Sequence, residues 1–266
     1  MTQLLAVHGA AGRMGRRVVA LATTDPRFDL VAAVEHPAHS SLGQDVGSLA
    51  GVDPTGVPLS SEWPEGLDVA IDFSLPDAVD GVTAECLRLE CGLVVATTGL
   101  EAEQKSRLEQ ASRHIPIVWA PSMSMAVNLT MRLAEQATAA LQDVNGGIDV
   151  EIIERHHRFK EDAPSGTALK FGELIAAQMK QPAQHVHGRE GKTGQRGRNE
   201  IGYHAVRVGD NPGEHTIVFG MLGETLELRV AASNRDSYAA GALAAAAWLA
   251  GKPPGLYSMF DVLGMS

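Results

Sequence analysis

The densest group of chemically active side chains lies between residues 154 and 168, where the sequence reads ERHHRFKEDAPSGTA. His156 and Lys160 are four residues apart, a spacing that places both on one face in strand or helix periodicity. A histidine and a lysine acting together can exchange protons with a bound molecule. In a regular strand His157 would point the opposite way, so the backbone must leave regular geometry if both histidines line one pocket.

A second feature of this segment is a predicted helix start. Pro164 is a plausible stop to the preceding segment, and Ser165, Gly166 and Thr167 then open a helical pattern. Amides and hydroxyls at a helix N-terminus attract a carboxylate or phosphate, and Lys160 adds a full positive charge nearby. The segment therefore predicts an anion site with acid–base groups beside it.

Three other interpretations of these residues stay open at this point. The histidines could bind zinc together with His185 and His187, although adjacent histidines do not easily chelate one ion, and we predict no metal. Ser165 and Lys160 could form a Ser–Lys amidohydrolase, although a capping serine is the everyday explanation for serine at a helix start. The histidines could also be solvated polar residues in a connecting segment.

A glycine-rich turn stands at the other end of the chain, between a predicted strand and a predicted helix. It reads Gly9, Ala10, Ala11, Gly12, Arg13, Met14 and Gly15, with alanine where the commonest dinucleotide fingerprint has its second glycine. Glycines permit a tight turn, and the amides at the helix start can hold a pyrophosphate. Glu35 ends the next strand, where a ribose diol is expected. The context predicts a dinucleotide site.

Three further strand ends could complete that site, because ligands of open α/β sheets bind at the carboxyl ends of the strands. Their residues are Asp72, Phe73 and Ser74; Ala96, Thr97, Thr98 and Gly99; and Ala120, Pro121, Ser122 and Met123.

These residues must be positioned by two different kinds of sheet. Apolar runs at 4–7, 30–34, 68–73, 93–97 and 115–119 alternate with helical patterns at 13–22, 77–89 and 101–114, which is typical of a doubly wound, Rossmann-like parallel sheet. After a long helical pattern at 125–142, strand patterns at 149–153, 205–208, 215–219 and 225–231 surround a helix at 167–179. These predict an α+β domain with a mostly antiparallel sheet.

The C-terminal pattern suggests how the two parts divide. Residues 238–250 form an Ala-rich helix that is apolar nearly all round, and such a helix requires burial on two sides, so we expect it to return to the first domain. The predicted domains are 1–124, completed by 236–266, and 125–235. Residues 182–202 carry Arg189, Lys192, Arg196 and Arg198 without apolar periodicity and predict a long loop, either functional or simply solvated.

Composition restricts the class of protein. The 266 residues are 44% hydrophobic and 20% charged, with a formal net charge of −10, which argues against nucleic-acid or anionic-membrane partners. Cys86 and Cys91 fit neither a zinc ribbon nor a redox pair and are expected to be buried thiols within one helix. The first residues lead directly into a strand without signal-peptide features, so we expect a cytoplasmic protein.

The sequence resembles the 4-hydroxy-tetrahydrodipicolinate reductase family, also called dihydrodipicolinate reductase. The resemblance is carried by GAAGRMG at 9–15, IDFS at 71–74, TTG at 97–99, ERHHRFKEDAPSGTA at 154–168, GREG at 188–191 and RVGDNPGEH at 207–215. It implies NADH- or NADPH-dependent reduction of a small cyclic dicarboxylate in lysine and diaminopimelate biosynthesis. It also implies a homotetramer built through the second domain.

The resemblance further implies roles for single residues. His156 and Lys160 match the acid–base pair, His157 a substrate contact, and Gly166 with Thr167 the substrate carboxylate site. The implied cofactor contacts are Gly9, Ala10, Ala11, Gly12, Arg13, Met14, Glu35, Ala96, Thr97, Thr98, Ala120, Pro121, Ser122 and Met123. This sequence departs from the family pattern at His36, where arginine is common, at Ala96, where glycine is usual, and at Ser122 with Met123, where the family has asparagine and an aromatic residue.

Two alternative functions remain at this stage. One is another NAD(P)-dependent amino-acid dehydrogenase of similar layout, and the other is a nucleotide-sensing module without turnover. The pair of His156 and Lys160 argues against a sensor, because a sensor needs the glycine turn but has no use for acid–base groups.

Overall fold

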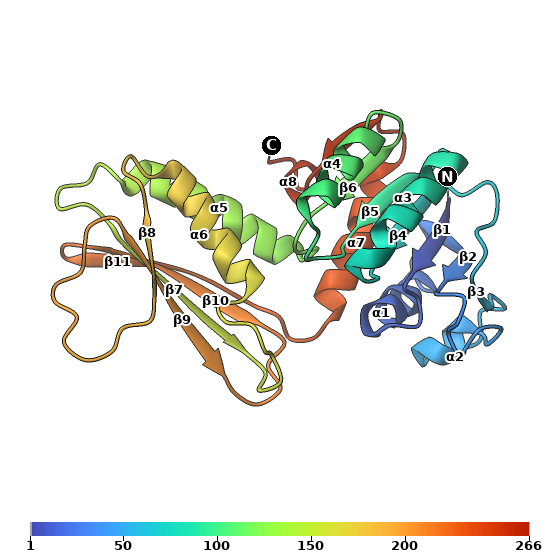
Figure 1. The fold of residues 1–266 in the computed structure, drawn as a ribbon, viewed down its shortest axis with the longest axis horizontal. Coiled ribbons are helices and arrows are strands. Elements are labelled where there is room, and N and C mark those ends of the chain that lie inside the picture. Colours follow the sequence, from blue (N-terminus) through green and yellow to red (C-terminus); the bar gives the residue numbers. More distant parts are fainter. Residues whose placement is uncertain (1, 266) are drawn as a thin grey trace. The chain divides into compact units, whose positions relative to one another are not determined.

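The chain folds into two compact units in the computed structural model, which describes residues 2–265 (Figure 1). The first unit contains residues up to 125 together with the segment from 235 onward, and the second contains residues 126–234. Met1 and Ser266, the outer ends of the predicted first domain, lie outside the described residues.

The first unit is built on a seven-stranded sheet in which every strand pair is parallel. The strand order is β12-β6-β5-β4-β1-β2-β3. Chain order reverses direction at β1, so the turn after β1 lies at the topological switch point of a doubly wound sheet. The strands are β1 Gln3–His8, β2 Phe28–Val34, β3 Leu59–Ser60, β4 Val69–Asp72, β5 Gly92–Val95, β6 Pro116–Trp119 and β12 Gly255–Tyr257.

Helices cover both faces of this sheet. Successive side chains of a strand point to opposite sides, and here both sides are apolar and need cover. Leu5 and Val7 of β1 belong to the core on one face, with α1 and α7, whereas Ala6 belongs to the core on the other, with α3 and α4. The helices are α1 Arg13–Ala22, α2 Val46–Ala50, a 3₁₀ turn at Pro76–Ala78, α3 Val79–Leu89, α4 Ala102–Ala111, α7 Asp236–Leu249 and α8 Met259–Val262.

Helix α7 returns to the first unit, and the packing there explains its composition. Its buried residues, among them Ala242, Ala245 and Ala246, lie in the same core as α1 and the sheet. Gly241 approaches so closely that a Cβ atom would lie 1.8 Å from the carbonyl oxygen of Met123. Small residues in α7 therefore let its backbone lie directly against the segment that follows β6.

The second unit contains a five-stranded sheet in the order β11-β10-β7-β9-β8. Its strands are β7 Asp149–His156, β8 Gln184–His187, β9 Glu200–Arg207, β10 Glu214–Met221 and β11 Glu224–Ala231. Strand β10 pairs antiparallel with β7 and β11, but β9 pairs parallel with both β7 and β8. The predicted α+β domain is confirmed, but its sheet is mixed rather than mostly antiparallel, because alternation of side chains does not report strand direction.

Only one face of this sheet is covered by helices. Figure 1 shows α5 (Met125–Leu141) and α6 (Gly166–Gln178) on the same side of the strands. In β7 Val150 and Ile152 are fully buried, whereas Ile153 is 41% exposed. The other face is therefore open in a single chain.

Several predicted elements differ from the structure. The segment 182–202 is not one loop, since β8 and the first residues of β9 pair within it and leave a loop at 188–199. Cys91 lies beyond the end of α3 rather than in one helix with Cys86, although both thiols are buried as expected. Short elements α2, β3, β12 and α8 have no periodicity long enough to detect.

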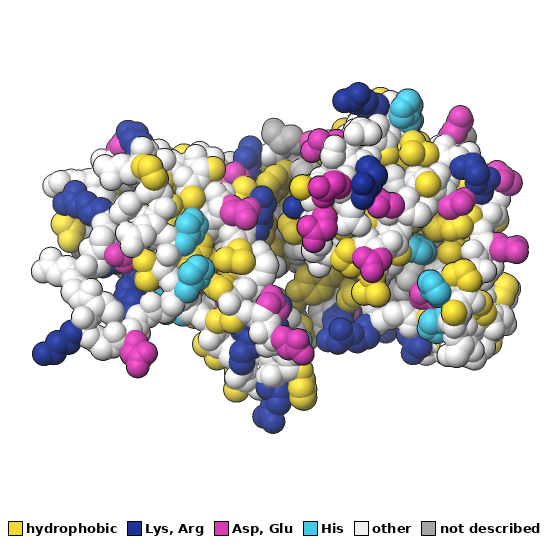
Figure 2. All heavy atoms as spheres, viewed as in Figure 1, with side chains coloured by type: hydrophobic (Ala, Val, Ile, Leu, Met, Phe, Trp, Pro, Cys, Tyr) yellow, Lys and Arg dark blue, Asp and Glu magenta, His cyan; other side chains and the backbone are white. Residues whose placement is uncertain are grey.

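The surface carries mixed charges. In Figure 2 acidic and basic side chains are interspersed over the face in view, without a broad basic area. Among the described residues no helix is both long and apolar enough to span a bilayer.

The close approach at Gly241 gives a test of the packing. Gly241→Ala should lower the free energy of unfolding by about 1–3 kcal/mol, because the new methyl group overlaps backbone that cannot move alone. Gly81→Ala in α3 is the matched control: a Cβ atom there would meet nothing within 4 Å, and the variant should gain about 0.5–1 kcal/mol from helix propensity. Urea unfolding followed by circular dichroism measures the free energy of unfolding of both variants. If Gly241→Ala gained as much stability as Gly81→Ala, the close packing at Gly241 would be contradicted.

Candidate functional site

The acid–base candidates in the second unit are placed by the end of β7. Glu154 and His156 follow Val150 and Ile152 on the helix-covered face, so polar groups occupy the last two inward positions of the strand. The strand register sets Arg207 of β9 beside His156 and His215 of β10 beside Glu154. Two buried polar positions are thus flanked by further polar groups on both neighbouring strands.

Glu154 is the centre of the hydrogen bonds in this cluster. Its Oε2 accepts from His156 Nδ1 at 2.6 Å and from Arg207 Nη1 at 2.7 Å. Its Oε1 accepts from Arg207 Nη2 at 2.8 Å and from the backbone N–H of Ser165 at 3.0 Å. The Glu154 side chain is fully buried, and the two-pronged contact with Arg207 balances its charge.

The ionisation of these groups follows from burial and neighbouring charge. Burial alone would raise the pKa of the Glu154 carboxyl, but hydrogen bonds from Arg207 and His156 outweigh it and hold that pKa below its ordinary value. Burial lowers the pKa of His156, and the charges of Lys160 and Arg207 add to that effect, whereas Glu154 opposes it. Burial also lowers the pKa of His215 to about 4. At neutral pH Glu154 is therefore charged and both rings are neutral.

Lys160 reaches this cluster by a different route from the one that periodicity predicted. Strand β7 ends at His156, and a turn follows in which the N–H of Lys160 donates to the carbonyl of His157 at 3.2 Å. The predicted departure from regular geometry is present, but the shared-face argument for Lys160 was wrong, because Lys160 lies outside the strand. Its ammonium pairs with Asp162 at 2.7 Å, and its positive charge contributes to lowering the pKa of His156.

The start of α6 is fastened next to the same cluster. Ser165 is the N-cap, with its Oγ accepting from the N–H of Ala168 at 3.2 Å and lying 3.1 Å from His215 Nε2. Gly166 is exposed and Thr167 is half-buried at the first positions of the helix. Ser165 thus acts as a cap, and the helix start offers Gly166 and Thr167 to an anion.

His157 also belongs to this region. Its N–H donates to the carbonyl of Asn211 at 2.8 Å, while its buried Nδ1 has no hydrogen-bond partner among the described residues. A buried ring nitrogen without a partner fits a position completed by a ligand.

Sequence reasoning missed three members of the cluster, namely Glu154, Arg207 and His215. Glu154 carried a usable signal, because it lies two positions before His156 and a strand places such residues on one face. Arg207 and His215 begin and end the motif RVGDNPGEH at 207–215, but nothing in that motif indicated a contact with Glu154.

The glycine turn of the first unit has the close approaches that a dinucleotide cradle requires. Gly9 has φ +71°, and a Cβ atom there would lie 2.7 Å from the carbonyl oxygen of Phe73. A Cβ atom on Gly15 would lie 2.1 Å from the carbonyl oxygen of Gly9. Gly12, the N-cap of α1, supplies no side-chain cap to the helix amides. The residues therefore fit a pyrophosphate held by backbone alone.

Glu35 stands beside this turn. Its Oε2 accepts from the N–H of Ala11 at 3.2 Å, and its Oε1 accepts from the N–H of His36 at 3.1 Å. His36 is exposed, and its Nδ1 accepts from the N–H of Ala38 at 3.1 Å. The carboxylate is thus held next to the glycine turn, where a ribose diol would be recognised.

The other predicted cofactor residues lie at strand ends of the same sheet. Thr97 Oγ1 donates to Asp72 Oδ2 at 2.6 Å, which ties the end of β5 to β4. Ala96 and Ala120 are buried, whereas Thr98 and Pro121 are exposed. Met123 is only 1% exposed and belongs to the apolar core, so its side chain packs inside the unit instead of lining an open surface.

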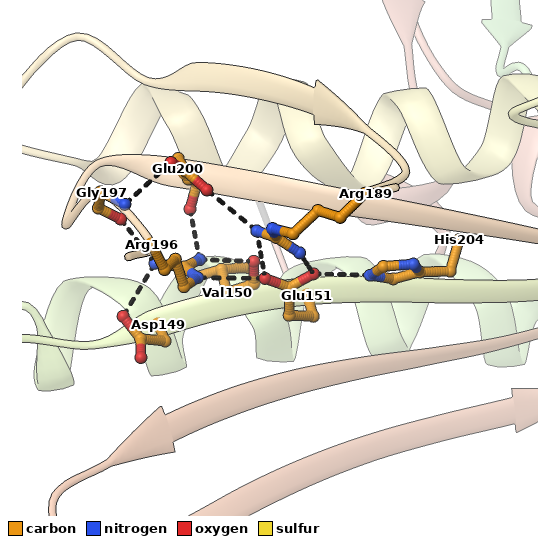
Figure 3. Close-up of polar contacts among 8 residues, drawn as sticks. All are labelled: Asp149, Val150, Glu151, Arg189, Arg196, Gly197, Glu200 and His204. Carbon is orange, nitrogen blue, oxygen red and sulfur yellow. Dashed lines mark hydrogen bonds and ion pairs between the residues drawn. The ribbon is translucent and has the colours of Figure 1, made fainter. Parts of the chain in front are cut away.

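A second charged cluster lies on the open face of the sheet in the second unit. Figure 3 shows Arg189 and Arg196 converging from the 188–199 loop on Glu151 of β7, with His204 of β9 beside them. Burial would raise the pKa of Glu151, but these donors lower it to about 2. Gly202 makes room, since a Cβ atom there would lie 1.9 Å from Glu151 Oε2. Arg189 and Arg196 therefore hold the loop to the sheet through ion pairs, whereas Lys192 and Arg198 of the same loop are exposed.

Neither cluster has the composition of a metal centre. Within residues 2–265, no three or more His, Cys, Asp or Glu side chains are arranged to hold a metal ion.

Comparisons with known proteins cover both units. Residues 4–123 match the family model "Dihydrodipicolinate reductase, N-terminus", and residues 126–263 match "Dihydrodipicolinate reductase, C-terminus". The chain is 67% identical over 269 residues to 4-hydroxy-tetrahydrodipicolinate reductase of Rhodopirellula baltica, covering 98% of this chain and 96% of that protein. It is 46% identical over 272 residues to the same reductase of Alkalilimnicola ehrlichii, covering all of both chains.

A solved structure agrees with these matches. Dipicolinate-bound dihydrodipicolinate reductase from Paenisporosarcina sp. TG-14 has 26% sequence identity and a TM-score of 0.75, over 98% of this chain and 99% of that one. The chain belongs to the dihydrodipicolinate reductase family, the oxidoreductases that reduce 4-hydroxy-tetrahydrodipicolinate in lysine and diaminopimelate biosynthesis.

Proposed function

We propose that His156 and Lys160 are the acid–base pair of this reduction, and that His157 with Gly166 and Thr167 binds the dicarboxylate substrate. The observation that carries the proposal is the hydrogen bond from His156 Nδ1 to Glu154, because it leaves Nε2 as the ring nitrogen able to exchange a proton. The substrate must take up a proton during reduction. Lys160 Nζ can deliver one directly, whereas Nε2 of neutral His156 must first take up a proton before the ring can deliver it.

The substrate site follows from charge. A cyclic dianion must meet concentrated donors in a chain whose net charge is −10. The amides at the start of α6, the hydroxyl of Thr167 and the ammonium of Lys160 are such donors. Dipicolinate, bound by the Paenisporosarcina relative, is the analogue we expect to bind here.

The first unit fits a nicotinamide dinucleotide, which supplies the hydride when bound. We assign Gly9, Ala10, Ala11, Gly12, Arg13 and Met14 to the pyrophosphate side and Glu35 to the ribose. Ala96, Thr97, Thr98, Ala120, Pro121, Ser122 and Met123 form the remaining wall. On this proposal, domain 1–124 with 236–266 binds NADH or NADPH, and domain 125–235 binds substrate.

The geometry at His36 supports use of both cofactors. Glu35 accepts ribose hydroxyls but repels a 2′-phosphate; at 4 Å each unit pair costs about 1 kcal/mol in water and about 4 at an effective dielectric of 20. Because His36 Nδ1 accepts from the N–H of Ala38, its proton lies on Nε2. A neutral His36 therefore still offers one donor to a phosphate.

Assembly and location complete the proposal. The open sheet face of the second unit exposes Ile153 and Val206, each by 41%, and we propose that this face builds a homotetramer. Sedimentation analysis, which measures the mass of the assembly in solution, would test the tetramer. We also propose a cytoplasmic location, as for other enzymes of amino-acid biosynthesis.

The acid–base assignment is tested by substitution. His156→Ala and Lys160→Ala should each lower kcat by about 10²–10⁴, while the dissociation constant of the reduced dinucleotide stays near wild type. Oxidation of the dinucleotide with enzymatically generated substrate measures kcat, and fluorescence titration measures binding. Lys170→Ala is the matched control, because that exposed lysine also pairs with an acid and should leave kcat unchanged. Retention of half the turnover in both variants would remove the pair from the mechanism.

Cofactor choice is tested at His36. His36→Arg should raise the ratio of kcat/KM for NADPH to kcat/KM for NADH by several-fold, because a guanidinium adds a charged, two-pronged phosphate contact. His39→Arg is the control, since it adds the same charge three residues further along. A wild-type preference for NADPH of about tenfold or more would show that repulsion from Glu35 does not govern the choice.

A further inference from the structure

Glu154 binds more groups than a structural ion pair requires. Its two oxygens accept four N–H groups from three elements: His156 on β7, Arg207 on β9 and Ser165 at the start of α6. Its side chain has no exposed surface. One carboxylate therefore joins the acid–base ring directly to the helix that carries the anion site.

We propose that Glu154 is a positioning residue for the reaction: it keeps the proton of neutral His156 on Nδ1, so that Nε2 faces the substrate, and it holds the start of α6 beside that ring. This inference rests on the role proposed above for His156. It adds a residue that touches neither substrate nor cofactor.

The argument for the tautomer is one of donors and acceptors. A charged carboxylate can only accept, so the ring nitrogen that lies 2.6 Å from Glu154 Oε2 must carry a hydrogen. The other three contacts of Glu154 also come from obligate donors, namely two guanidinium N–H groups and one backbone N–H. A glutamine at 154 would turn an NH₂ group toward at least one of these donors.

The charges around His156 determine in which direction its pKa should change when Glu154 loses its charge. Glu154 faces the ring from β7, Arg207 from β9, neutral His215 from β10, and Lys160 with its partner Asp162 from the following turn. Glu154 raises the pKa of His156, whereas burial, Lys160 and Arg207 lower it. Removing the Glu154 charge must lower that pKa further, but loosening the packing would admit water and raise it toward the ordinary value.

The first measurement uses the unaltered protein. Nitrogen-15 NMR of histidine-labelled protein above the pKa of His156 should show the hydrogen on Nδ1, with His156→Asn used to assign the signal. A hydrogen on Nε2 in the neutral ring would overturn the proposal whether or not any variant folds.

The second measurement compares two carboxylates of the same strand. In Glu154→Gln the NMR pKa of His156 should fall, the limb of the kcat–pH profile that reports His156 should move to lower pH, and kcat at neutral pH should fall by about 10²-fold. Glu151→Gln is the matched control, because Glu151 also holds arginines and a histidine but lies on the opposite face; it should leave the pKa of His156 unchanged. An unchanged or raised pKa in Glu154→Gln would overturn the proposal.

The two proposals fail separately. If His156→Ala retains turnover, the acid–base role of His156 is wrong, yet the NMR tautomer and pKa still decide whether Glu154 orients the ring. If His156→Ala abolishes turnover but Glu154→Gln shifts the pKa upward, only the positioning role is wrong.

Discussion

A buried carboxylate with no exposed surface must be surrounded by donors, and in the second unit that requirement determines the geometry of the site. Glu154 follows the apolar inward residues Val150 and Ile152 of β7 and is itself only 1% exposed, so bulk water cannot replace a missing partner. It draws Arg207 and His156 together across two strands and ties the N–H of Ser165 to them. Removing any of these donors would leave the buried carboxylate with an unmet hydrogen bond. The ring of His156, the end of β7 and the start of α6 are therefore held together.

The glycine turn of the first unit is constrained by backbone packing instead of buried charge. Gly9 and Gly15 leave no room for a Cβ atom, because the carbonyl oxygens of Phe73 and Gly9 lie too close. Glu35 is held beside this turn by the N–H of Ala11. In the proposed function, backbone amides would bind the dinucleotide, whereas charged side chains would bind the dianionic substrate.

Local patterns were enough to predict the first sheet and the glycine-rich turn that follows its first strand. They could not reveal that β7 and β9 run parallel, because strand direction depends on partners about 50 residues apart. They also misplaced Lys160, since periodicity does not show where a strand ends, and β7 ends at His156. Arg207 and His215 could not be linked to Glu154 from the chain alone, because their contact exists only after the sheet forms.

Glu154 and Arg207 act as one unit on this view, and a double-mutant cycle in the free energy of unfolding measures their coupling. Glu154→Gln and Arg207→Met should each cost about 3–5 kcal/mol, because each breaks a buried pair and strands polar groups, while the double variant should cost clearly less than their sum. The predicted coupling is therefore large and favourable. Costs that add within about 0.5 kcal/mol would contradict the account, because independent residues cannot hold the site together as one piece.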